Sequence, residues 1–306
     1  MVARALAQPL VIGLDVGGTK ILAGTMDHDG KVHTRHEVET PTSSEEDVVA
    51  ALDSAVEALL DEQVRAIGYG IPSNLDRHTR VALQSTNLPL DEFDLVGHSR
   101  ERFGLPVGIE NDGNAAALAE WRLGAGRGFD NLVMLVLGTG VGGGLILDGA
   151  LYHGWAELGH IVVLAHGPPC QGNCHGRGHL ETLASGTAAA REARELYGSE
   201  GDGHDLVERA RSGDSAAGAK LAEIAEYLGV AIGSLANIFD PEIVVIGGGF
   251  GRAAGELLLG PAQMAARREA LTPVDRTLRV VPAELGADAG LVGAGLLAFA
   301  ALDAEA

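Results

Sequence analysis

Residues 10–27, L-V-I-G-L-D-V-G-G-T-K-I-L-A-G-T-M-D, combine two apolar runs with a glycine turn between them. The first run, LVIGLDV, is almost continuously apolar, as expected of a central strand that is buried on both faces of a sheet. The second run, KILAGTMD, and a third, KVHTRHEV at residues 31–38, alternate more between apolar and polar side chains. Residues 10–38 are therefore predicted to form three strands joined by tight turns.

The turn D-V-G-G-T-K between the first two strands has the composition of a phosphate-binding loop. Gly17 and Gly18 let backbone N–H groups approach an anion, Thr19 adds a hydroxyl, Lys20 adds a charge, and Asp15 ends the buried strand. An ordinary glycine hairpin with an exposed aspartate is the alternative. A Walker A loop is excluded, because no Gly-Lys-Ser/Thr follows at the required spacing.

Residues 131–147, NLVMLVLGTGVGGGLIL, repeat the order of strand, glycine turn and strand. Gly138, Gly140 and Gly143 have the spacing G-x-G-x-x-G of a dinucleotide site, but an apolar strand follows them where that site needs a helix. Two such hairpins, one in each half of the chain, predict a duplicated architecture with phosphates held between two lobes.

Polar side chains are predicted at a strand-to-helix junction in the first half. Pro106–Glu110 is a short apolar strand, and the Ala-rich segment that follows N-D-G-N favours a helix. Asn111 and Asp112 therefore lie at the helix N-terminus, where Asp112 is either a cap or a base that faces a cleft. Asn87, in T-N-L-P, is either a ligand-facing amide or a turn former.

The composition excludes several classes of protein. The chain has 306 residues, 46% of them hydrophobic and 44 of them glycine, which indicates a turn-rich globular fold large enough for two lobes. A formal charge of −20 argues against nucleic acid as a partner. Neither an apolar run of the ~20 residues that span a bilayer nor a signal peptide is recognisable, so a cytoplasmic protein is expected.

The loop-rich stretch of residues 157–181, ELGHIVVLAHGPPCQGNCHGRGHLE, contains both cysteines of the chain. Zinc prefers four nitrogen or sulfur ligands gathered on irregular backbone. The spacing predicts a zinc site with four ligands: His160, Cys170, Cys174 and His179. A disulfide or two free thiols is the alternative, and His166 and His175 keep the identity of the fourth ligand open. The flanking Glu157 and Glu181 are candidates for binding a polar ligand.

Taken in order, these motifs resemble the ROK family of repressors, open reading frames and sugar kinases. The resemblance rests on D-V-G-G-T-K, E-N-D-G-N-A-A-A-L-A-E, L-G-T-G-V-G-G-G, E-L-G-H with its metal loop, and V-V-I-G-G-G, and it covers almost the whole chain. It implies an α/β, two-lobed fold of the actin-like, ribonuclease-H-like type. Residues 1–115, joined by a C-terminal helix at 290–306, would form one lobe, and residues 116–289 with zinc loop 157–181 the other.

The resemblance also implies roles for residues. Asp112 is the implied catalytic base, which accepts the proton of the sugar hydroxyl that attacks the γ-phosphate. The implied sugar ligands are Gly70, Asn87, Asn111, Asp112, Glu157, His160 and Glu181, with His160 also binding zinc. The implied neighbours of ATP and magnesium are Asp15, Gly17, Gly18, Thr19, Lys20, Gly138, Thr139 and Gly140, with Gly247 and Gly248 beside the adenosine.

An ATP-dependent hexokinase is therefore expected, with glucose as the leading substrate, Mg²⁺ and structural Zn²⁺ as cofactors, and a homodimer as the family's usual assembly. Two features depart from the family pattern: the metal loop has Cys-x-x-x-Cys with His179 in place of Cys-x-Cys with a third cysteine, and Ser73 replaces a glycine. The alternatives are a sugar-binding regulator without kinase activity, a kinase for N-acetylmannosamine, mannose, allose or fructose, and a polyphosphate-dependent glucokinase. Only nine residues precede the first strand, which disfavours a repressor with an N-terminal helix-turn-helix.

Overall fold

The structure is a computed structural model that describes residues 9–85, 88–171 and 174–305. These residues divide into two compact units. Unit 1 comprises residues up to Ala119, the short segment His153–Trp155, and residues from Asp288 onward; unit 2 comprises Glu120–Tyr152 and Ala156–Ala287. Each unit has its own five-stranded sheet and its own hydrophobic core.

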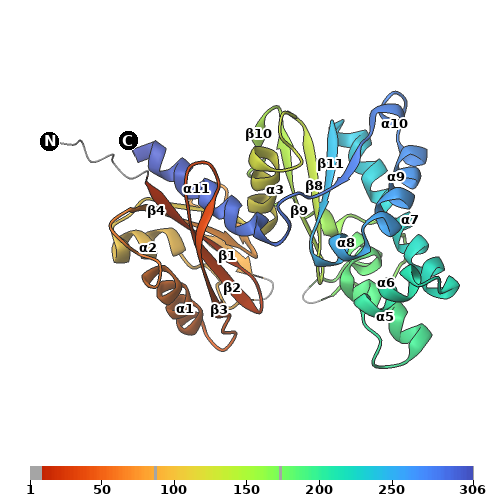
Figure 1. Ribbon diagram of the computed structural model, residues 1–306, viewed down its shortest axis with the longest axis horizontal. Coiled ribbons are helices and arrows are strands. Elements are labelled where there is room, and N and C mark those ends of the chain that lie inside the picture. Colours follow the sequence, from red (N-terminus) through yellow and green to blue (C-terminus); the bar gives the residue numbers. More distant parts are fainter. Residues whose placement is uncertain (1–8, 86–87, 172–173, 306) are drawn as a thin grey trace. The chain divides into compact units, whose positions relative to one another are not determined.

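The sheet of unit 1 has the strand order β3-β2-β1-β4-β7. The first three strands, which are labelled in Figure 1, are antiparallel, whereas β4 and β7 run parallel to β1. The three strands predicted for residues 10–38 are confirmed. The bounds are β1 Leu10–Val16, β2 Lys20–Met26, β3 Val32–Glu39, β4 Val64–Ile71 and β7 Val107–Asn111.

The sheet of unit 2 repeats this topology in the order β10-β9-β8-β11-β12. An antiparallel hairpin is again followed by two strands parallel to its first member. The predicted duplication is therefore confirmed. The bounds are β8 Leu132–Leu137, β9 Val141–Leu147, β10 Ala150–Leu151, β11 Ile243–Gly247 and β12 Val280–Pro282.

Helices cover both sheets. In unit 1 they are α1 (Glu45–Glu57), α2 (Leu95–Phe103), the start of α3 (Asp112–Leu123) and α11 (Ala289–Glu305), beside the small hairpin β5 (Ser73–Leu75) and β6 (Ala82–Ser85). In unit 2 they are α4 (Leu180–Ala184), α5 (Gly186–Tyr197), α6 (Gly203–Arg211), α7 (Ser215–Phe239), α8 (Gly249–Ala254), α9 (Glu256–Glu269) and α10 (Val274–Thr277), with 3₁₀ turns at Leu158–His160 and Gly286–Asp288.

Helix α11 lies close against the sheet of unit 1 because the strands present glycines to it. A Cβ atom on Gly68 of β4 would lie 1.8 Å from the carbonyl oxygen of Ala294, and one on Gly13 of β1 would lie 2.4 Å from that of Leu291. Both neighbours are backbone atoms of the helix, so no side-chain rotation relieves the overlap. The C-terminal helix is therefore part of the core that positions β1, β4 and β7.

We expect Gly68→Ala to lower the free energy of unfolding by about 3 kcal/mol, because a methyl group there forces α11 away from the sheet. Gly218 of α7 is the matched control, since a Cβ at that position meets no atom within 4 Å. Gly218→Ala should raise stability by about 0.5 to 1 kcal/mol through its helix propensity. Urea denaturation of both variants measures this, and equal effects would contradict the packing described for α11.

Two helices in the described part of the chain, Ser215–Phe239 and Gly286–Glu305, are long and apolar enough by length and composition to cross a membrane. Neither is a continuous apolar run, because charged residues interrupt the first helix and flank the apolar part of the second. In the structure, 56% of the most apolar 18-residue segment of the first helix is buried, and 44% of that of the second. The first helix buries Leu221, Leu228 and Leu235 in the core of unit 2, so its apolar composition is explained by packing within the protein.

Candidate functional site

Three adjacent parallel strands of unit 1 bring predicted site residues into register at their carboxyl ends. Asp15 of β1 pairs with Gly70 of β4, which pairs with Glu110 of β7, and the next pair joins Ile71 to Asn111. Carboxyl ends of parallel strands are where α/β sheets bind ligands. The apolar strand runs thus place the predicted side chains along one sheet edge.

Asp15 and Asp112 form a pair of repelling carboxylates at this edge. Burial is the main cause that raises the pKa of Asp15 to about 7, and the negative charge of Asp112 adds to it, while Lys20 opposes the rise. Burial also raises the pKa of Asp112. The N–H of Gly113, which donates to Asp112 Oδ1 at 2.8 Å, lowers this pKa but does not cancel the effect of burial. Two carboxylates with raised pKa values can bind a divalent cation, and one of them can also accept a proton during a reaction.

The raised pKa of Asp15 predicts a dependence of stability on pH. A carboxyl whose pKa is higher in the folded than in the unfolded state stabilises the fold below about pH 4, and this contribution is lost as pH rises through about 7. Asp15→Asn should therefore be more stable than the unmodified protein at pH 8 by about 2 to 4 kcal/mol, with a smaller gain at pH 5.

Urea denaturation of the ligand-free protein at the two pH values measures this gain. The same substitution at Asp29, an exposed turn residue, is the control and should leave the profile unchanged. A gain at Asp15 that is equal at pH 5 and pH 8 would show that burial of the charge is not its cause.

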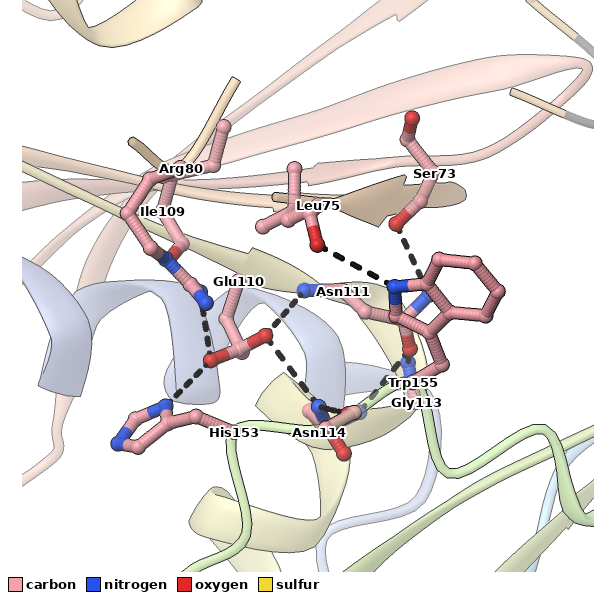
Figure 2. Close-up of polar contacts among 11 residues, drawn as sticks. Ser73, Leu75, Arg80, Ile109, Glu110, Asn111, Gly113, Asn114, His153 and Trp155 are labelled. Carbon is pink, nitrogen blue, oxygen red and sulfur yellow. Dashed lines mark hydrogen bonds and ion pairs between the residues drawn. The ribbon is translucent and has the colours of Figure 1, made fainter. Parts of the chain in front are cut away.

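The junction between β7 and α3 is held by Asn111, as Figure 2 shows. Asn111 Oδ1 accepts hydrogen bonds from the N–H groups of Gly113 at 2.9 Å and Asn114 at 3.3 Å, which caps the first turn of the helix. Its Nδ2 donates to the carbonyl of Ser73 at 3.5 Å. Asp112 is therefore the first helical residue rather than the cap, and its side chain is available for another role.

Glu110 is the buried centre of this junction, and the sequence analysis did not identify it. Its Oε2 lies 2.6 Å from Arg80 Nη2 and 2.7 Å from His153 Nδ1, while its Oε1 accepts hydrogen bonds from the Asn111 N–H at 3.0 Å and from Asn114 Nδ2 at 3.2 Å (Figure 2). Burial alone would raise the pKa of Glu110, but His153, Arg80 and the two amides outweigh it and lower the pKa. An ionised Glu110 thus fixes both Asn111 and the start of α3.

Other predicted residues of unit 1 have varied surroundings. Gly70 lies close to the start of α3, where a Cβ would be 3.8 Å from Asp112 Cα. Ser73, in place of the expected glycine, is buried and donates to the carbonyl of Gln84 at 3.0 Å, within the β5–β6 hairpin. Lys20 is exposed and forms a 2.8 Å ion pair with Glu37. Asn87 lies outside the described residues.

Unit 2 brings together the four side chains predicted to bind zinc: His160, Cys170, Cys174 and His179. One ligand atom from each lies within 4.8 Å of all the others. His160 Nδ1 is 3.2 Å from His179 Nδ1 and 3.7 Å from Cys170 Sγ, and Cys174 Sγ is 3.6 Å from His179 Nδ1. A tetrahedral zinc ion separates nitrogen and sulfur ligands by about 3.3 to 3.8 Å, so the cluster is compatible with zinc.

The chemistry of the cluster agrees with its geometry. Both cysteines are free, and burial is the main cause that raises the pKa of Cys170 to about 12, which a divalent cation would reverse because it binds the thiolate. Burial lowers the pKa of His179, which favours the neutral imidazole that binds metals. His166 and His175 are exposed and are not part of the cluster.

Glu181 connects the cluster of cysteines and histidines to the glycine turn after β8. Its Oε1 lies 3.5 Å from Cys170 Sγ, and its Oε2 accepts a hydrogen bond from the N–H of Val141 at 3.3 Å. A Cβ on Gly140 would be 2.2 Å from the same Oε2. Glu157 is exposed and directly precedes the 3₁₀ turn that carries His160. The structure thus gathers Glu181, the cluster and the turn within unit 2.

The glycines predicted to bind ATP lie at the carboxyl ends of two adjacent strands of unit 2. Gly138 follows β8, and Gly247 ends β11, where it pairs with Val136. Gly248 has φ +84°, and a Cβ there would be 2.3 Å from the carbonyl oxygen of Leu137, so only glycine fits. The N-terminus of α5 adjoins the turn, because the N–H of Gly186 donates to the carbonyl of Gly138 at 2.8 Å.

Comparison with known proteins identifies this arrangement. Residues 11–301 match the ROK family. A glucokinase of Streptomyces coelicolor is 36% identical over 312 residues, which cover 94% of this chain and 97% of that protein. A solved ROK family glucokinase from Streptomyces griseus, in complex with glucose and AMPPNP, is 36% identical with a TM-score of 0.84 over 95% of this chain and 99% of its own.

A solved ROK family transcriptional regulator, a homologue of the E. coli MLC protein, is also similar. It is 26% identical, with a TM-score of 0.87 over 97% of this chain and 79% of its own. The resemblance inferred from the motifs and the predicted α/β sugar-kinase fold are confirmed by these matches. The chain belongs to the ROK family.

Proposed function

We propose that the protein is an ATP-dependent hexokinase that converts glucose to glucose 6-phosphate. The observation that carries this proposal is the 36% identity, over nearly the whole of both chains, to the S. griseus glucokinase solved with glucose and an ATP analogue. The carboxylate pair in unit 1 and the glycine turns in unit 2 supply the groups that phosphoryl transfer to a sugar hydroxyl requires.

Asp112 is proposed as the general base. Its raised pKa strengthens it as a proton acceptor, because a base accepts a proton best when its pKa approaches the working pH. Asn111, held by its hydrogen bonds to the Gly113 N–H and to the Glu110 carboxylate, presents an amide to the sugar hydroxyls. The full proposed set of sugar ligands is Gly70, Asn87, Asn111, Asp112, Glu157, His160 and Glu181.

The phosphates of ATP are proposed to bind backbone N–H groups of the two glycine turns. Those groups, with the side chains of Thr19 and Lys20, neutralise and orient the phosphates in a chain with a net charge of −20. Magnesium, when bound, neutralises charge on the transferred phosphoryl group, and Asp15 is its proposed protein ligand. The proposed ATP-binding residues are Asp15, Gly17, Gly18, Thr19, Lys20, Gly138, Thr139, Gly140, Gly247 and Gly248.

Zinc is proposed to have a structural role through His160, Cys170, Cys174 and His179. Since His160 Nδ1 points into the cluster, Nε2 is its proposed contact to the sugar. The two units are proposed to act as the two lobes of the kinase, residues 1–115 with 290–306 and residues 116–289. A cytoplasmic homodimer is proposed as its cellular form.

A sugar-binding regulator without kinase activity is the second candidate, favoured by the TM-score of 0.87 to the ROK family transcriptional regulator. The enzyme is preferred because the sequence identity to glucokinases is higher, at 36% against 26%.

Measuring product formation with a panel of sugars and two phosphate donors tests the proposal. The sugars are glucose, mannose, allose, fructose and N-acetylmannosamine, each with ATP and magnesium or with polyphosphate. Turnover highest with glucose and ATP is expected. If calorimetry detects sugar binding but no combination of sugar and phosphate donor gives turnover, the regulator is favoured. Turnover with polyphosphate but not with ATP would show that polyphosphate is the phosphate donor.

A further inference from the structure

The segment His153–Trp155 is anchored residue by residue to the β7–α3 junction and to strand β5 of unit 1. His153 Nδ1 contacts Glu110 at 2.7 Å, the carbonyl of Gly154 accepts from Asn114 Nδ2 at 3.3 Å, and Trp155 Nε1 donates to the carbonyl of Leu75 at 3.3 Å (Figure 2). The position of the Trp155 ring is therefore set by three consecutive contacts.

The ring of Trp155 and the amide of Asn111 are both hydrogen-bonded to carbonyls of the short strand β5. Asn111 Nδ2 donates to the carbonyl of Ser73, and Trp155 Nε1 donates to that of Leu75, two residues further along β5. Carbonyls two residues apart on a strand point the same way and are roughly 7 Å apart. The register shift of this hairpin places its extra residue, Leu83, on β6 and not on β5. The indole and the amide thus occupy neighbouring places along one strand, as Figure 2 shows.

Trp155 is also strongly exposed for a residue held in this way. Its polar atom is satisfied by Leu75, yet 56% of the residue's surface is accessible, more than for any other described aromatic residue among the large exposed hydrophobics. A fixed aromatic face beside a ligand-binding amide provides an apolar wall that needs no further ordering on binding. The arrangement is that of binding sites in which aromatic walls accompany a few placed polar groups.

We propose that Trp155 is a specificity-determining residue whose exposed indole face stacks on the apolar C–H face of the sugar that Asn111 binds. The inference rests on the proposed hexokinase function and adds a residue to its acceptor site. A pyranose presents rows of C–H bonds on its two faces and hydroxyls around its rim. The indole thus contacts the C–H face of the sugar, whereas the amides and carboxylates of the site bind the hydroxyls around its rim.

Stacking of this kind selects against axial hydroxyl groups. Glucose in its chair form keeps the hydroxyls at C2, C3 and C4 equatorial, so both of its faces carry only C–H bonds there. Mannose carries an axial hydroxyl at C2 on one face, and allose carries one at C3 on the other. The wall formed by Trp155 therefore excludes whichever of these epimers directs its hydroxyl at the ring.

Steady-state kinetics of Trp155→Ala test whether the indole of Trp155 stacks on the sugar. We expect the KM for glucose to rise about tenfold, with a smaller change in kcat, and the preference for glucose over one of the two epimers to fall about fivefold. Trp155→Phe, which keeps a ring, should stay within about threefold of the unmodified protein. Leu83→Ala, which removes another exposed apolar side chain, on β6, is the control and should change neither value.

Tryptophan fluorescence provides a second test with Trp155 intact. The chain has two tryptophans, and Trp121 is bonded separately through its Nε1 to the carbonyl of Phe129. In a Trp121→Phe background, glucose should shift or quench the emission of Trp155 with a midpoint that equals the calorimetric Kd. This readout does not depend on the folding of any Trp155 variant.

The outcomes separate the two proposals. Unchanged emission, or an unchanged glucose KM in Trp155→Ala, in a protein that binds and phosphorylates glucose would overturn the role of Trp155 and leave the kinase standing. Absence of both sugar binding and turnover in the unmodified protein would remove the hexokinase function and this inference with it.

Discussion

Asp112→Asn should lower kcat for glucose by roughly 10²- to 10⁴-fold, the effect typical of losing a general base. The amide keeps the size of the side chain but cannot accept the proton of the attacking hydroxyl. The KM for glucose should change little, because the remaining proposed sugar ligands, Asn111 among them, are untouched. The fold should be retained, since Asn111, not Asp112, caps α3 through Gly113 and Asn114.

The matched control is Asp94→Asn, the same substitution at the start of another helix of unit 1. Asp94 caps α2 by accepting the N–H of Gly97 at 2.8 Å, and asparagine is as good a cap. We expect its kcat to equal that of the unmodified protein. Near-normal turnover in Asp112→Asn would reject Asp112 as the base, whatever the sugar proves to be.

Removing the metal should have the second large effect. Chelation, or Cys174→Ser, leaves a loop rich in glycine and proline that is held by backbone hydrogen bonds, such as those from the Cys170 N–H to the carbonyl of Gly176 at 2.9 Å and from the Gly178 N–H to that of Pro168 at 2.8 Å. We expect the melting temperature to fall by about 10 °C and the glucose KM to rise roughly tenfold, because Glu181 lies against Cys170 and His160 belongs to the cluster.

His175→Ala is the control for the metal experiment, because His175 is an exposed histidine next to Cys174 in the chain and is not in the cluster. It should retain one zinc per chain by elemental analysis and an unchanged melting temperature. Metal-free protein with a normal glucose KM would show that the cluster does not order the sugar ligands. Loss of zinc in His175→Ala would contradict the ligand set.

The fold was largely predictable because its signals are local. The apolar run LVIGLDV and its repeat NLVMLVL identified the central strands β1 and β8, and the glycine turns after them identified the duplicated hairpins. The clustering of the four predicted zinc ligands was predictable for the same reason, since three of the four lie within ten residues of one another. Short sequence separation makes such patterns visible without any knowledge of tertiary contacts.

The missed residues act through contacts between distant segments. Glu110 appeared to be the polar end of a strand, and only the fold brings it to Arg80 and to His153, 43 residues away. The ring of Trp155 similarly depends on Leu75, 80 residues earlier in the chain. No periodicity or spacing reveals such pairs, because Arg80, His153 and Trp155 lie in irregular segments that only tertiary contacts bring to their partners.

The most direct test of the hexokinase assignment is the formation of glucose 6-phosphate from glucose, ATP and magnesium, measured side by side for the unmodified protein and Asp112→Asn. We expect steady formation of glucose 6-phosphate by the unmodified protein and a loss of at least about 10²-fold in the variant. Glucose bound but not phosphorylated by the unmodified protein, or equal rates in the two proteins, would contradict the assignment.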